Sequence, residues 1–488
     1  MSHSRRHVII IGAGIAGTSL ARELLQKTSL YSITAFLDDD PTKIGSKIAG
    51  IPVLGPVSEA ITNFANNPQK ELIIAIPSLD NATLKQIYQM GKEQGFNKIH
   101  IVPSISTIIE GDVHFTQIRE INPQDILGRK PAPLNIAETL AWYENKRILV
   151  TGAGGSIGSE LCRQLLEAGA ERLYLFGHGE NSIYQIDREL RELQKGGVGS
   201  KTTVVPIIGE LRDRAYMMNI MKKLKVSIVF HAAAFKHVPL MEQNPVLAIE
   251  NNVLGTKNLI DAAINAGIQR FVFISTDKAV DPICIYGASK LIGEHVVLAG
   301  TQTSQIETII VRFGNVLGSR GSILPLFQRQ IQYGGPVTVT HPDATRYFMT
   351  IPEACSLVLK TTHKGKSGES YIFDMGYPVR ILDLAENIIK FYGYEPYKDI
   401  PIEVIGLRPG EKLHESLIAQ NENFIKTDFE RISLLKRNYT PMDIENLFRN
   451  LEPIFTPSNS AYRDAHILYS IIKKFVPTVE EPEHVSKQ

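Results

Sequence analysis

The residues with the clearest chemical potential are the stretch Ser275-Thr276-Asp277-Lys278 and the two residues Tyr286 and Lys290 that follow it. Residues 271–274, just before this stretch, are apolar and rich in β-formers, which predicts a buried parallel strand. Thr276, Asp277 and Lys278 would then leave the carboxyl end of a strand, where open α/β sheets bind ligands. Tyr286 and Lys290 are four residues apart at the start of a predicted helix, so they share one face. A lysine so placed can lower the pKa of a phenol and make it a base near neutral pH.

By itself a Tyr-x-x-x-Lys pair is a weak signal, because most such pairs belong to solvated helix faces. The composition narrows the classes of protein to which the pair can belong. The chain has 488 residues, which suits two or three domains, and its 52 Lys and Arg nearly balance 51 Asp and Glu. This balance argues against nucleic acid or an anionic membrane surface as a partner.

Cysteine usage and hydropathy point to the cytoplasm. The three cysteines, Cys162, Cys284 and Cys355, are far apart and form no C-x-x-C motif, so we expect neither a disulfide framework nor a metal site. No signal peptide opens the chain, and no apolar run reaches about 18 residues. We therefore predict a cytoplasmic protein without a membrane span.

Residues 1–128 are expected to form a Rossmann-like nucleotide-binding domain. An apolar strand over 7–11 runs into Gly12-Ala13-Gly14-Ile15-Ala16-Gly17, a G-x-G-x-x-G turn with a helix-like segment behind it. Such glycines let backbone amides at a helix N-terminus approach a phosphate, and an acid after the next strand can bind a ribose hydroxyl. The same turn also occurs where it only serves packing. The candidate nucleotide site consists of Gly12, Gly14, Gly17 and Asp38.

A stronger signal follows a predicted linker over 129–146, which contains two prolines and one short helix. Gly152, Gly155 and Gly158 give the spacing G-x-x-G-x-x-G between a strand and a helix. In the short-chain dehydrogenase/reductase class this turn accompanies a Tyr/Lys pair, so the two patterns support each other. The alternation of strands and helices over 147–311 predicts a doubly wound parallel sheet that binds a nicotinamide cofactor.

The cofactor could be NADP or NAD. The strand over 172–176 is followed by Gly177 and not by an acid that would bind a 2′-hydroxyl and repel a 2′-phosphate. Other positions are expected to cover the adenine, to let the cofactor lie against the backbone, or to stiffen the site. The candidate cofactor-binding residues are Gly152, Gly155, Ser156, Ile157, Gly158, Glu210, Leu211, Ala232, Ala233, Asn252, Tyr286 and Lys290.

Three later loops, 312–322, 341–348 and 406–412, contain arginines, together with glycine in the first and third. Glycine frees backbone amides and arginine binds phosphate with two parallel hydrogen bonds, so each loop could bind an anion. Each alone is more typical of solvated charges, but together they predict a substrate-binding lobe for a diphosphate sugar over 312–440, with sheet elements shared. Residues 441–488 are expected to form a helical tail with a disordered polar end.

From about residue 145 to 417 the chain closely resembles the nucleotide-sugar 4,6-dehydratases of bacterial glycan and polysaccharide biosynthesis. More narrowly, it resembles the UDP-N-acetylglucosamine 4,6-dehydratases within the extended short-chain dehydrogenases. The resemblance lies in TGAGGSIGSEL, HAAAFKHVPLME, STDKAV, RFGNVLGSRGS, HPDATRYFMTIPEA and GLRPGEKLHE. Residues 1–128 resemble the nucleotide-binding domain that precedes the dehydratase in long members of the group. Those members usually carry membrane helices in front, and this sequence shows none.

The resemblance implies a tightly bound nicotinamide that is regenerated in each turnover. Tyr286, aided by Lys290 and Thr276, would take the proton of the 4-hydroxyl while hydride leaves carbon 4. Lys278 would be the base that removes the proton from carbon 5, and Asp277 the acid for the departing 6-hydroxyl. The product would be a UDP-4-keto-6-deoxy-HexNAc. The residues implied for the UDP-sugar site are Lys236, Asn315, Arg320, Arg346, Arg408 and Glu411.

Several points stay open at the level of sequence. Many long members have methionine where this chain has Tyr286. A tyrosine at this position is more like the short branch, which inverts carbon 5. Retention or inversion at carbon 5 is therefore undecided. A homo-oligomer is expected. One alternative is a UDP-sugar 4-epimerase, which shares the fold, cofactor and Tyr/Lys pair but does not need Asp277 and Lys278. The other is a nucleotide-sensing regulator without catalytic activity.

Overall fold

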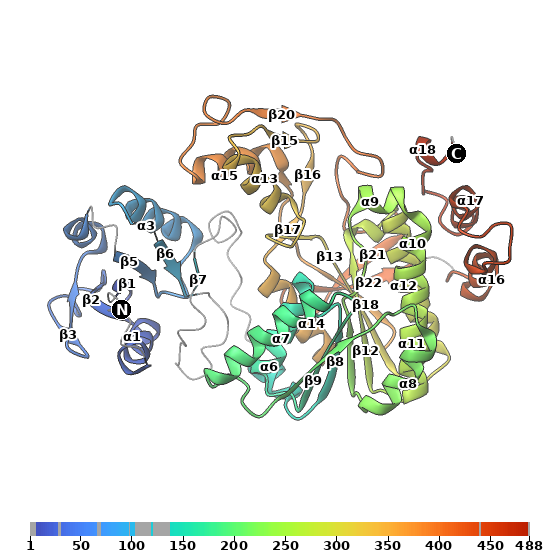
Figure 1. The fold of residues 1–488 in the computed structure, drawn as a ribbon, viewed down its shortest axis with the longest axis horizontal. Coiled ribbons are helices and arrows are strands. Elements are labelled where there is room, and N and C mark those ends of the chain that lie inside the picture. The colour runs from blue at the N-terminus through green and yellow to red at the C-terminus, as the bar shows by residue number, and fades with distance from the viewer. Residues whose placement is uncertain are drawn as a thin grey trace. The chain divides into compact units, whose positions relative to one another are not determined.

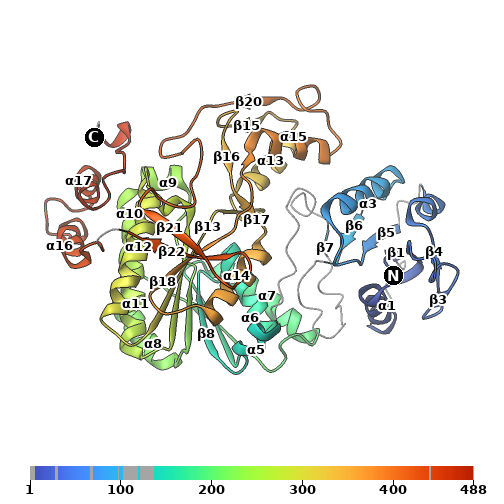
Figure 2. The ribbon, with the colours of Figure 1, turned by 180° about the vertical axis from the view of Figure 1, so that it is seen from behind.

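The computed structural model describes residues 6–27, 31–65, 70–96, 98–102, 119–120, 137–438 and 441–486. The chain divides into two compact units, 1–137 and 138–488, each with its own sheet (Figures 1 and 2). Of the predicted linker, residues 129–136 lie outside the described residues. Its last part contains the short helix α5 (Ala137–Tyr143), which runs toward the first strand of the second unit. Among the described residues, no helix is long and apolar enough to cross a membrane.

The first unit is a Rossmann-like layer of mostly parallel strands in the order β3-β4-β2-β1-β5-β6-β7. Alternation of apolar strands with amphipathic helices produces it, and the fully buried side chains of Ile10 and Phe36 lie in its core. Its strands are β1 (Arg6–Ile11), β2 (Tyr31–Leu37), β3 (Lys47–Ile48), β4 (Ile51–Leu54), β5 (Lys70–Ile74), β6 (Lys98–Ile101) and β7 (Arg119–Glu120). Its helices are α1 (Ile15–Lys27), α2 (Val57–Ala60) and α3 (Asn81–Glu93).

The second unit contains a nine-stranded sheet in the order β10-β9-β8-β11-β12-β13-β18-β22-β21. The first seven strands are parallel, and β22 and β21 are added at one edge by antiparallel pairing of β22 with β18 and of β21 with β22. The predicted doubly wound fold is confirmed. The strands are β8 (Arg147–Thr151), β9 (Arg172–Gly177), β10 (Thr203–Ile208), β11 (Ile228–His231), β12 (Arg270–Thr276), β13 (Glu307–Phe313), β18 (Glu369–Phe373), β21 (Glu422–Lys426) and β22 (Ile432–Arg437).

Helices cover both faces of this sheet (Figure 1). They are α6 (Ser156–Glu167), α7 (Glu180–Lys195), α8 (Arg214–Leu224), α9 (Val238–Gln243), α10 (Pro245–Ile249), α11 (Gly255–Ala266), α12 (Ile285–Gln302) and α14 (Ile351–Lys364). The chain crosses back between β10 and β11, so β8 and β11 are neighbours from which it departs in opposite directions. In open α/β sheets, the carboxyl ends of strands at such a switch point form the ligand site.

A smaller lobe rises beyond one end of the sheet (Figure 1). Its helices are α13 (Ile323–Gln332) and α15 (Ile381–Phe391), and its short strands form three pairs. These pairs are β14 (Asn315–Val316) with β17 (Phe348–Met349), β15 (Val337–Val339) with β20 (Ile402–Val404), and β16 (Thr345–Arg346) with β19 (Val379–Arg380). The lobe thus comes from chain segments that return repeatedly to the sheet.

The C-terminal tail forms the helices α16 (Ile444–Phe455), α17 (Ala465–Phe475) and α18 (Glu483–Ser486). The expectation of a disordered polar end is wrong for residues 477–486. Val479 and Val485 are buried in the core of the second unit. Thr478 Oγ1 donates a hydrogen bond to the Pro282 carbonyl at 2.8 Å, and Glu480 N–H donates to the Ile283 carbonyl at 3.1 Å. Apolar side chains placed between the acidic residues provide the burial that composition alone concealed.

A group of buried charges connects β13, β21 and β22 with the helix α12. Arg312 on β13 is fully buried, and its guanidinium binds Glu294 of α12 at 2.8 Å and Glu422 of β21 at 2.7 Å. Arg437 of β22 binds the same Glu294, and Ser275 Oγ donates to it. Burial raises the pKa of Glu294, but the charges of Arg312 and Arg437 outweigh burial and bring this pKa down to about 2. Strands distant in sequence are therefore held together by compensated charge.

Changing Glu294 to glutamine is expected to lower the free energy of unfolding by about 3–5 kcal/mol, because Arg312 would lose half of its buried counter-charge. The folded-state pKa of Glu294 lies below its ordinary value of 4.5, so this carboxylate stabilises the fold above that pH and less as the pH falls toward 2. Urea unfolding of wild type and E294Q should thus differ less at about pH 3.5 than at about pH 7. An equal difference at both would contradict this account.

Candidate active site

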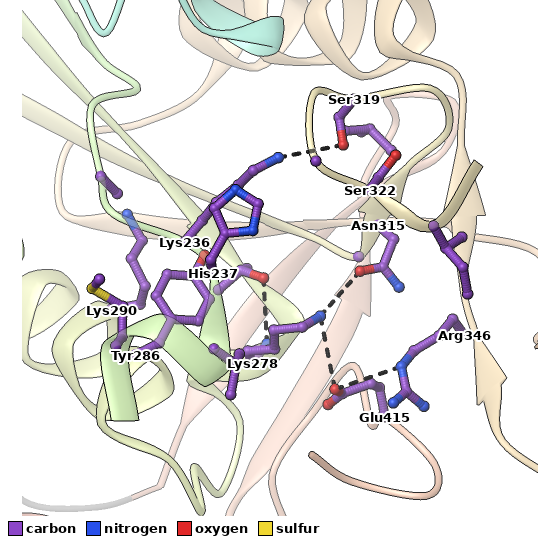
Figure 3. A pocket seen from close by; sticks show the side chains of 18 of the residues that line it. Lys236, His237, Lys278, Tyr286, Lys290, Asn315, Ser319, Ser322, Arg346 and Glu415 are labelled. Atoms are coloured by element: carbon purple, nitrogen blue, oxygen red, sulfur yellow. Dashed lines mark hydrogen bonds and ion pairs between the residues drawn. The ribbon is translucent and has the colours of Figure 1, made fainter. Parts of the chain in front are cut away.

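A cavity of about 800 Å³ lies where the sheet meets the lobe, at the carboxyl ends of β11, β12 and β13 (Figure 3). A volume of this order is typical of small-molecule sites. Most of the residues singled out from the sequence line it: Gly155, Ser156, Ile157, Gly158, Ala232, Lys236, Thr276, Lys278, Tyr286, Lys290, Asn315, Arg320, Arg346, Arg408 and Glu411. The tertiary structure thus brings the glycine turn, the Tyr/Lys pair and the arginine loops together.

The glycine turn after β8 fits the pyrophosphate of a dinucleotide. Gly152 has φ +67°, and an added Cβ would lie 2.8 Å from the backbone of Ala233. Gly158 packs so tightly on the Gly152 carbonyl oxygen that no Cβ fits there. Gly155 caps the N-terminus of α6, and the residues from Gly155 to Gly158 line the cavity. Backbone amides at a helix N-terminus, approached closely, are the usual partners of such a phosphate.

Some predicted cofactor residues do not line the cavity. Glu210 pairs with Arg212 at 3.3 Å, and Leu211 is buried in the hydrophobic core. Gly152 and Ala233 shape the turn from behind. Asn252 spans two elements instead: its Oδ1 accepts from Phe235 N–H at 2.9 Å, and its Nδ2 donates to Ser289 Oγ at 3.0 Å. Asn252 therefore ties the loop after β11 to α12 without touching the cavity.

Tyr286 and Lys290 lie on the first turns of α12, and both are buried. Burial raises the pKa of Tyr286 to about 12, although the charge of Lys278 and a hydrogen bond with Thr276 lower it. Burial also lowers the pKa of Lys290 to about 7, and its Nζ lies 4.1 Å from the centre of the Phe273 ring. The predicted lowering of the phenol pKa by Lys290 is therefore wrong here, because burial dominates and the nearby charge is that of Lys278.

The Lys278 ammonium points toward side-chain oxygens, of which Figure 3 shows those of Asn315 and Glu415. Its Nζ is 3.1 Å from Asp277 Oδ1, 3.1 Å from Asn315 Oδ1 and 3.7 Å from Glu415 Oε1. Burial favours the neutral amine, but Asp277 and Glu415 outweigh it and hold the pKa of Lys278 above its ordinary value. Lys278 is thus an ammonium at neutral pH, a state that can donate a proton and cannot accept one.

Asp277 is enclosed and does not line the cavity. It begins a single 3₁₀ turn, 277–279, and its side chain is fully buried. Its Oδ1 accepts hydrogen bonds from Thr276 Oγ1 at 2.8 Å and from Lys278 Nζ. Its Oδ2 lies against Gly314, where an added Cβ would be 3.2 Å away. Asp277 and Lys278 are adjacent in sequence but differ in access, because Lys278 lines the cavity and Asp277 does not.

Glu415, which sequence reasoning missed, does line the cavity. Arg346 accounts for its position: Arg346 Nη1 donates to the Leu413 carbonyl at 3.0 Å, Nη2 to Glu411 Oε1 at 3.0 Å, and Nε is 4.0 Å from Glu415 Oε1. The guanidinium of Arg346 is thus occupied with the loop over 411–415 and is not free to bind a phosphate. The only sequence signal for Glu415 was its place at the end of the stretch GLRPGEKLHE.

Three other predicted substrate residues have distinct surroundings. Lys236 Nζ donates to Ser319 Oγ at 3.4 Å, and burial, with the charge of Lys278, lowers its pKa. Arg320 lies on the glycine turn: its N–H donates to Ser156 Oγ at 3.0 Å and its Nη1 to the Gly154 carbonyl at 2.8 Å. Arg408 lines the cavity from the lobe. Cationic groups therefore reach both the cofactor side and the lobe side.

The glycine turn of the first unit is shaped as expected, but its acid is engaged. Gly12 has φ +101°, and Gly17 packs too tightly on the Gly12 carbonyl oxygen to admit a Cβ, whereas Gly14 borders open space. Asp38 Oδ2 accepts a hydrogen bond from Ala13 N–H at 2.6 Å and lies 3.4 Å from Lys43 Nζ. The carboxylate expected to bind a ribose is therefore held against the turn itself.

Comparison with known families agrees with this division. The family model "Polysaccharide biosynthesis protein" matches residues 148–437, and the model "PglD N-terminal domain" matches residues 7–90. A solved structure, "X-ray structure of Pen from Bacillus thuringiensis", is 29% identical, with a TM-score of 0.53, over 64% of this chain and 98% of that chain.

Curated relatives extend the similarity. "Probable polysaccharide biosynthesis protein EpsC" of Bacillus subtilis is 44% identical over 88% of this chain and 71% of that protein. "UDP-N-acetylglucosamine 4,6-dehydratase (inverting)" of Campylobacter jejuni is 31% identical over 63% and 87%. "UDP-glucose 4-epimerase" of Rickettsia akari is 34% identical over 59% and 81%. The chain therefore belongs to the polysaccharide biosynthesis protein family, within the nucleotide-sugar dehydratases and epimerases of the short-chain dehydrogenase/reductase class.

Proposed function

We propose that the chain is a UDP-N-acetylglucosamine 4,6-dehydratase that forms a UDP-4-keto-6-deoxy-HexNAc in bacterial glycan or polysaccharide biosynthesis. The observation that carries the proposal is one cavity lined by Thr276, Tyr286 and Lys290 together with Lys278 and Glu415, with Asp277 buried behind Lys278. The Campylobacter jejuni relative named for this activity supports the choice of substrate.

Oxidation at carbon 4 needs a group that takes the proton of the 4-hydroxyl. Tyr286 has this role in the proposal, with Thr276 at its side and Lys290 one helical turn further along α12. Because burial disfavours a phenolate, a positive charge must lie close by, and Lys278 supplies one. A bound nicotinamide would supply the acceptor for the hydride that leaves carbon 4 and the donor that returns it to carbon 6.

Elimination of water then needs a proton acceptor at carbon 5 and a proton donor at the 6-hydroxyl. The groups around Lys278 can provide both, because an ammonium and two carboxylates meet there within 4 Å. Epimerisation at carbon 4 has no use for such a set. This difference favours the dehydratase, although one relative of similar identity is named as a 4-epimerase.

Binding of the UDP-sugar is assigned to groups from the sheet and from the lobe. Lys236, Asn315, Arg408 and Glu411 would contact the substrate, while Arg346 would hold the loop over 411–415 and Arg320 would cover the glycine turn. The cofactor is expected to be NADP or NAD. We further expect a homo-oligomer in the cytoplasm, with a nucleotide as the ligand of residues 1–128.

Incubation with UDP-N-acetylglucosamine is expected to yield a product lighter by one water. The hydride taken from carbon 4 returns to carbon 6, so the eliminated water is the only net loss. Mass spectrometry of the nucleotide sugar measures this directly. An unchanged mass with a new UDP-N-acetylgalactosamine signal would identify an epimerase. No conversion at all, in protein loaded with either dinucleotide, would favour the nucleotide-sensing regulator.

Changing Tyr286 to phenylalanine is expected to slow reduction of the nicotinamide by the sugar about 10²–10⁴-fold, the usual contribution of a general base. Stopped-flow absorbance of the reduced nicotinamide measures this step alone. Tyr333→Phe is the matched control, because that tyrosine is 82% exposed on the lobe and its rate should equal wild type. A wild-type rate in Y286F would move the role to Thr276.

A further inference from the structure

The two carboxylates beside Lys278 differ in what they can reach. Asp277 is fully buried, and its Oδ1 already accepts from Thr276 and Lys278. Glu415 is on the cavity wall, and its Oε1 faces both Lys278 Nζ and Arg346 Nε. Of these two carboxylates, only Glu415 therefore borders the space that would hold a sugar.

The second oxygen of Glu415, like Oδ2 of Asp277, is buried and has no hydrogen-bond partner among the residues that the structure describes, but only Glu415 lines the cavity. Leaving a carboxylate oxygen unsatisfied away from water is costly, and such groups are rare unless they serve a ligand or a reaction. The side chain of Glu415 is only 5% exposed, so bulk water contributes little to its solvation. Because Glu415 lines the cavity, a ligand held there could meet this oxygen.

The backbone around Glu415 is held firmly. Thr345 N–H donates to the Leu413 carbonyl at 3.1 Å, and the Thr345 hydroxyl is 2.9 Å from His414 Nδ1. Arg346 binds the carbonyls of Leu413 and Lys412. Glu415 therefore projects from a loop that β16 fixes at both backbone and side-chain level, as a catalytic group requires.

We propose that Glu415 is the base of the elimination step and that the Lys278 ammonium is its acid, a deepening that rests on the proposed function. After carbon 4 is oxidised, Glu415 takes the proton from carbon 5, and the electron pair of that C–H bond forms the bond between carbons 5 and 6. The C–O bond at carbon 6 breaks, and the oxygen leaves as water with a proton from Lys278. Asp277 acts through Lys278 as a positioning residue.

This assignment reverses the role expected for Lys278 and replaces Asp277 by Glu415. It agrees with the ammonium state that Asp277 and Glu415 impose on Lys278. The proton on Glu415 is available for return to carbon 5 when hydride is delivered to carbon 6, so the pair needs no outside reactant. Lys278 regains its proton from solvent, because its side chain is 20% exposed.

The test is hydrogen exchange at carbon 5 in D₂O, measured by mass and NMR on both product and recovered UDP-N-acetylglucosamine. In Glu415→Gln, nicotinamide reduction should persist, while carbon 5 exchange and water loss should each fall at least about 100-fold. In Lys278→Arg, which keeps the positive charge beside Tyr286 but is a far weaker acid, nicotinamide reduction should persist and water loss should fall, while carbon 5 of the recovered sugar should still gain deuterium. Wild-type exchange in E415Q, or no exchange in a K278R that still reduces its nicotinamide, would overturn the assignment.

Two further variants keep the test decisive. Glu415→Asp retains a carboxylate one methylene shorter and should keep exchange at a reduced rate, whereas E415D without exchange would overturn the proposal. Glu403→Gln, an exposed carboxylate on β20, removes the same charge from the same lobe and should match wild type. Loss of nicotinamide reduction in a folded E415Q would place Glu415 before the elimination and also refute its role. If wild type itself neither reduces the nicotinamide nor releases water, the proposed function fails instead.

Discussion

A lysine that is mostly buried can remain an ammonium only if opposite charge lies within a few ångströms of it. Lys278 meets this requirement with two carboxylates of different origin: Asp277, its neighbour in the chain, and Glu415, which returns from the lobe. Glu415 in turn depends on Arg346, whose donors hold the loop over 411–415. The ion pairs of Lys278 therefore connect the sheet to the lobe, and the cavity lies where these two parts meet.

The segment 275–286, to which the proposed function assigns the chemistry, is held in place by contacts outside the cavity. At its start, Ser275 donates to Glu294, which belongs to the buried group of charges around Arg312. Further along, the carbonyls of Pro282 and Ile283 accept hydrogen bonds from the C-terminal tail. The tail and the hairpin of β21 and β22 thus contribute to the cavity without entering it, because they immobilise the chain between Lys278 and Tyr286. Such support keeps reacting groups within the narrow geometric limits that catalysis needs.

Patterns that act over a few residues were reliable guides. Apolar runs located the parallel strands, and the spacing of Gly152, Gly155 and Gly158 located the turn at α6. The pairing of Tyr286 with Lys290 on one helix face followed from helical geometry alone. Sequence reasoning failed where burial decided the outcome. It placed Asp277 beside Lys278 in the cavity, but Asp277 is buried in a 3₁₀ turn. It also predicted a lowered pKa for Tyr286, whereas desolvation raises that pKa.

The sequence by itself determined the two Rossmann-like folds, the glycine turns and the Tyr/Lys pair on one helix, because each depends on periodicity and spacing within one element. Only the tertiary structure decided which carboxylate faces the cavity, which arginine is occupied by the protein itself, and how the polar tail is buried. Those outcomes depend on contacts between residues far apart in the chain, such as Lys278 with Glu415 and Arg312 with Glu422. In a low-dielectric interior, the interaction between two charges depends on their distance in space, and this distance cannot be read from the local sequence.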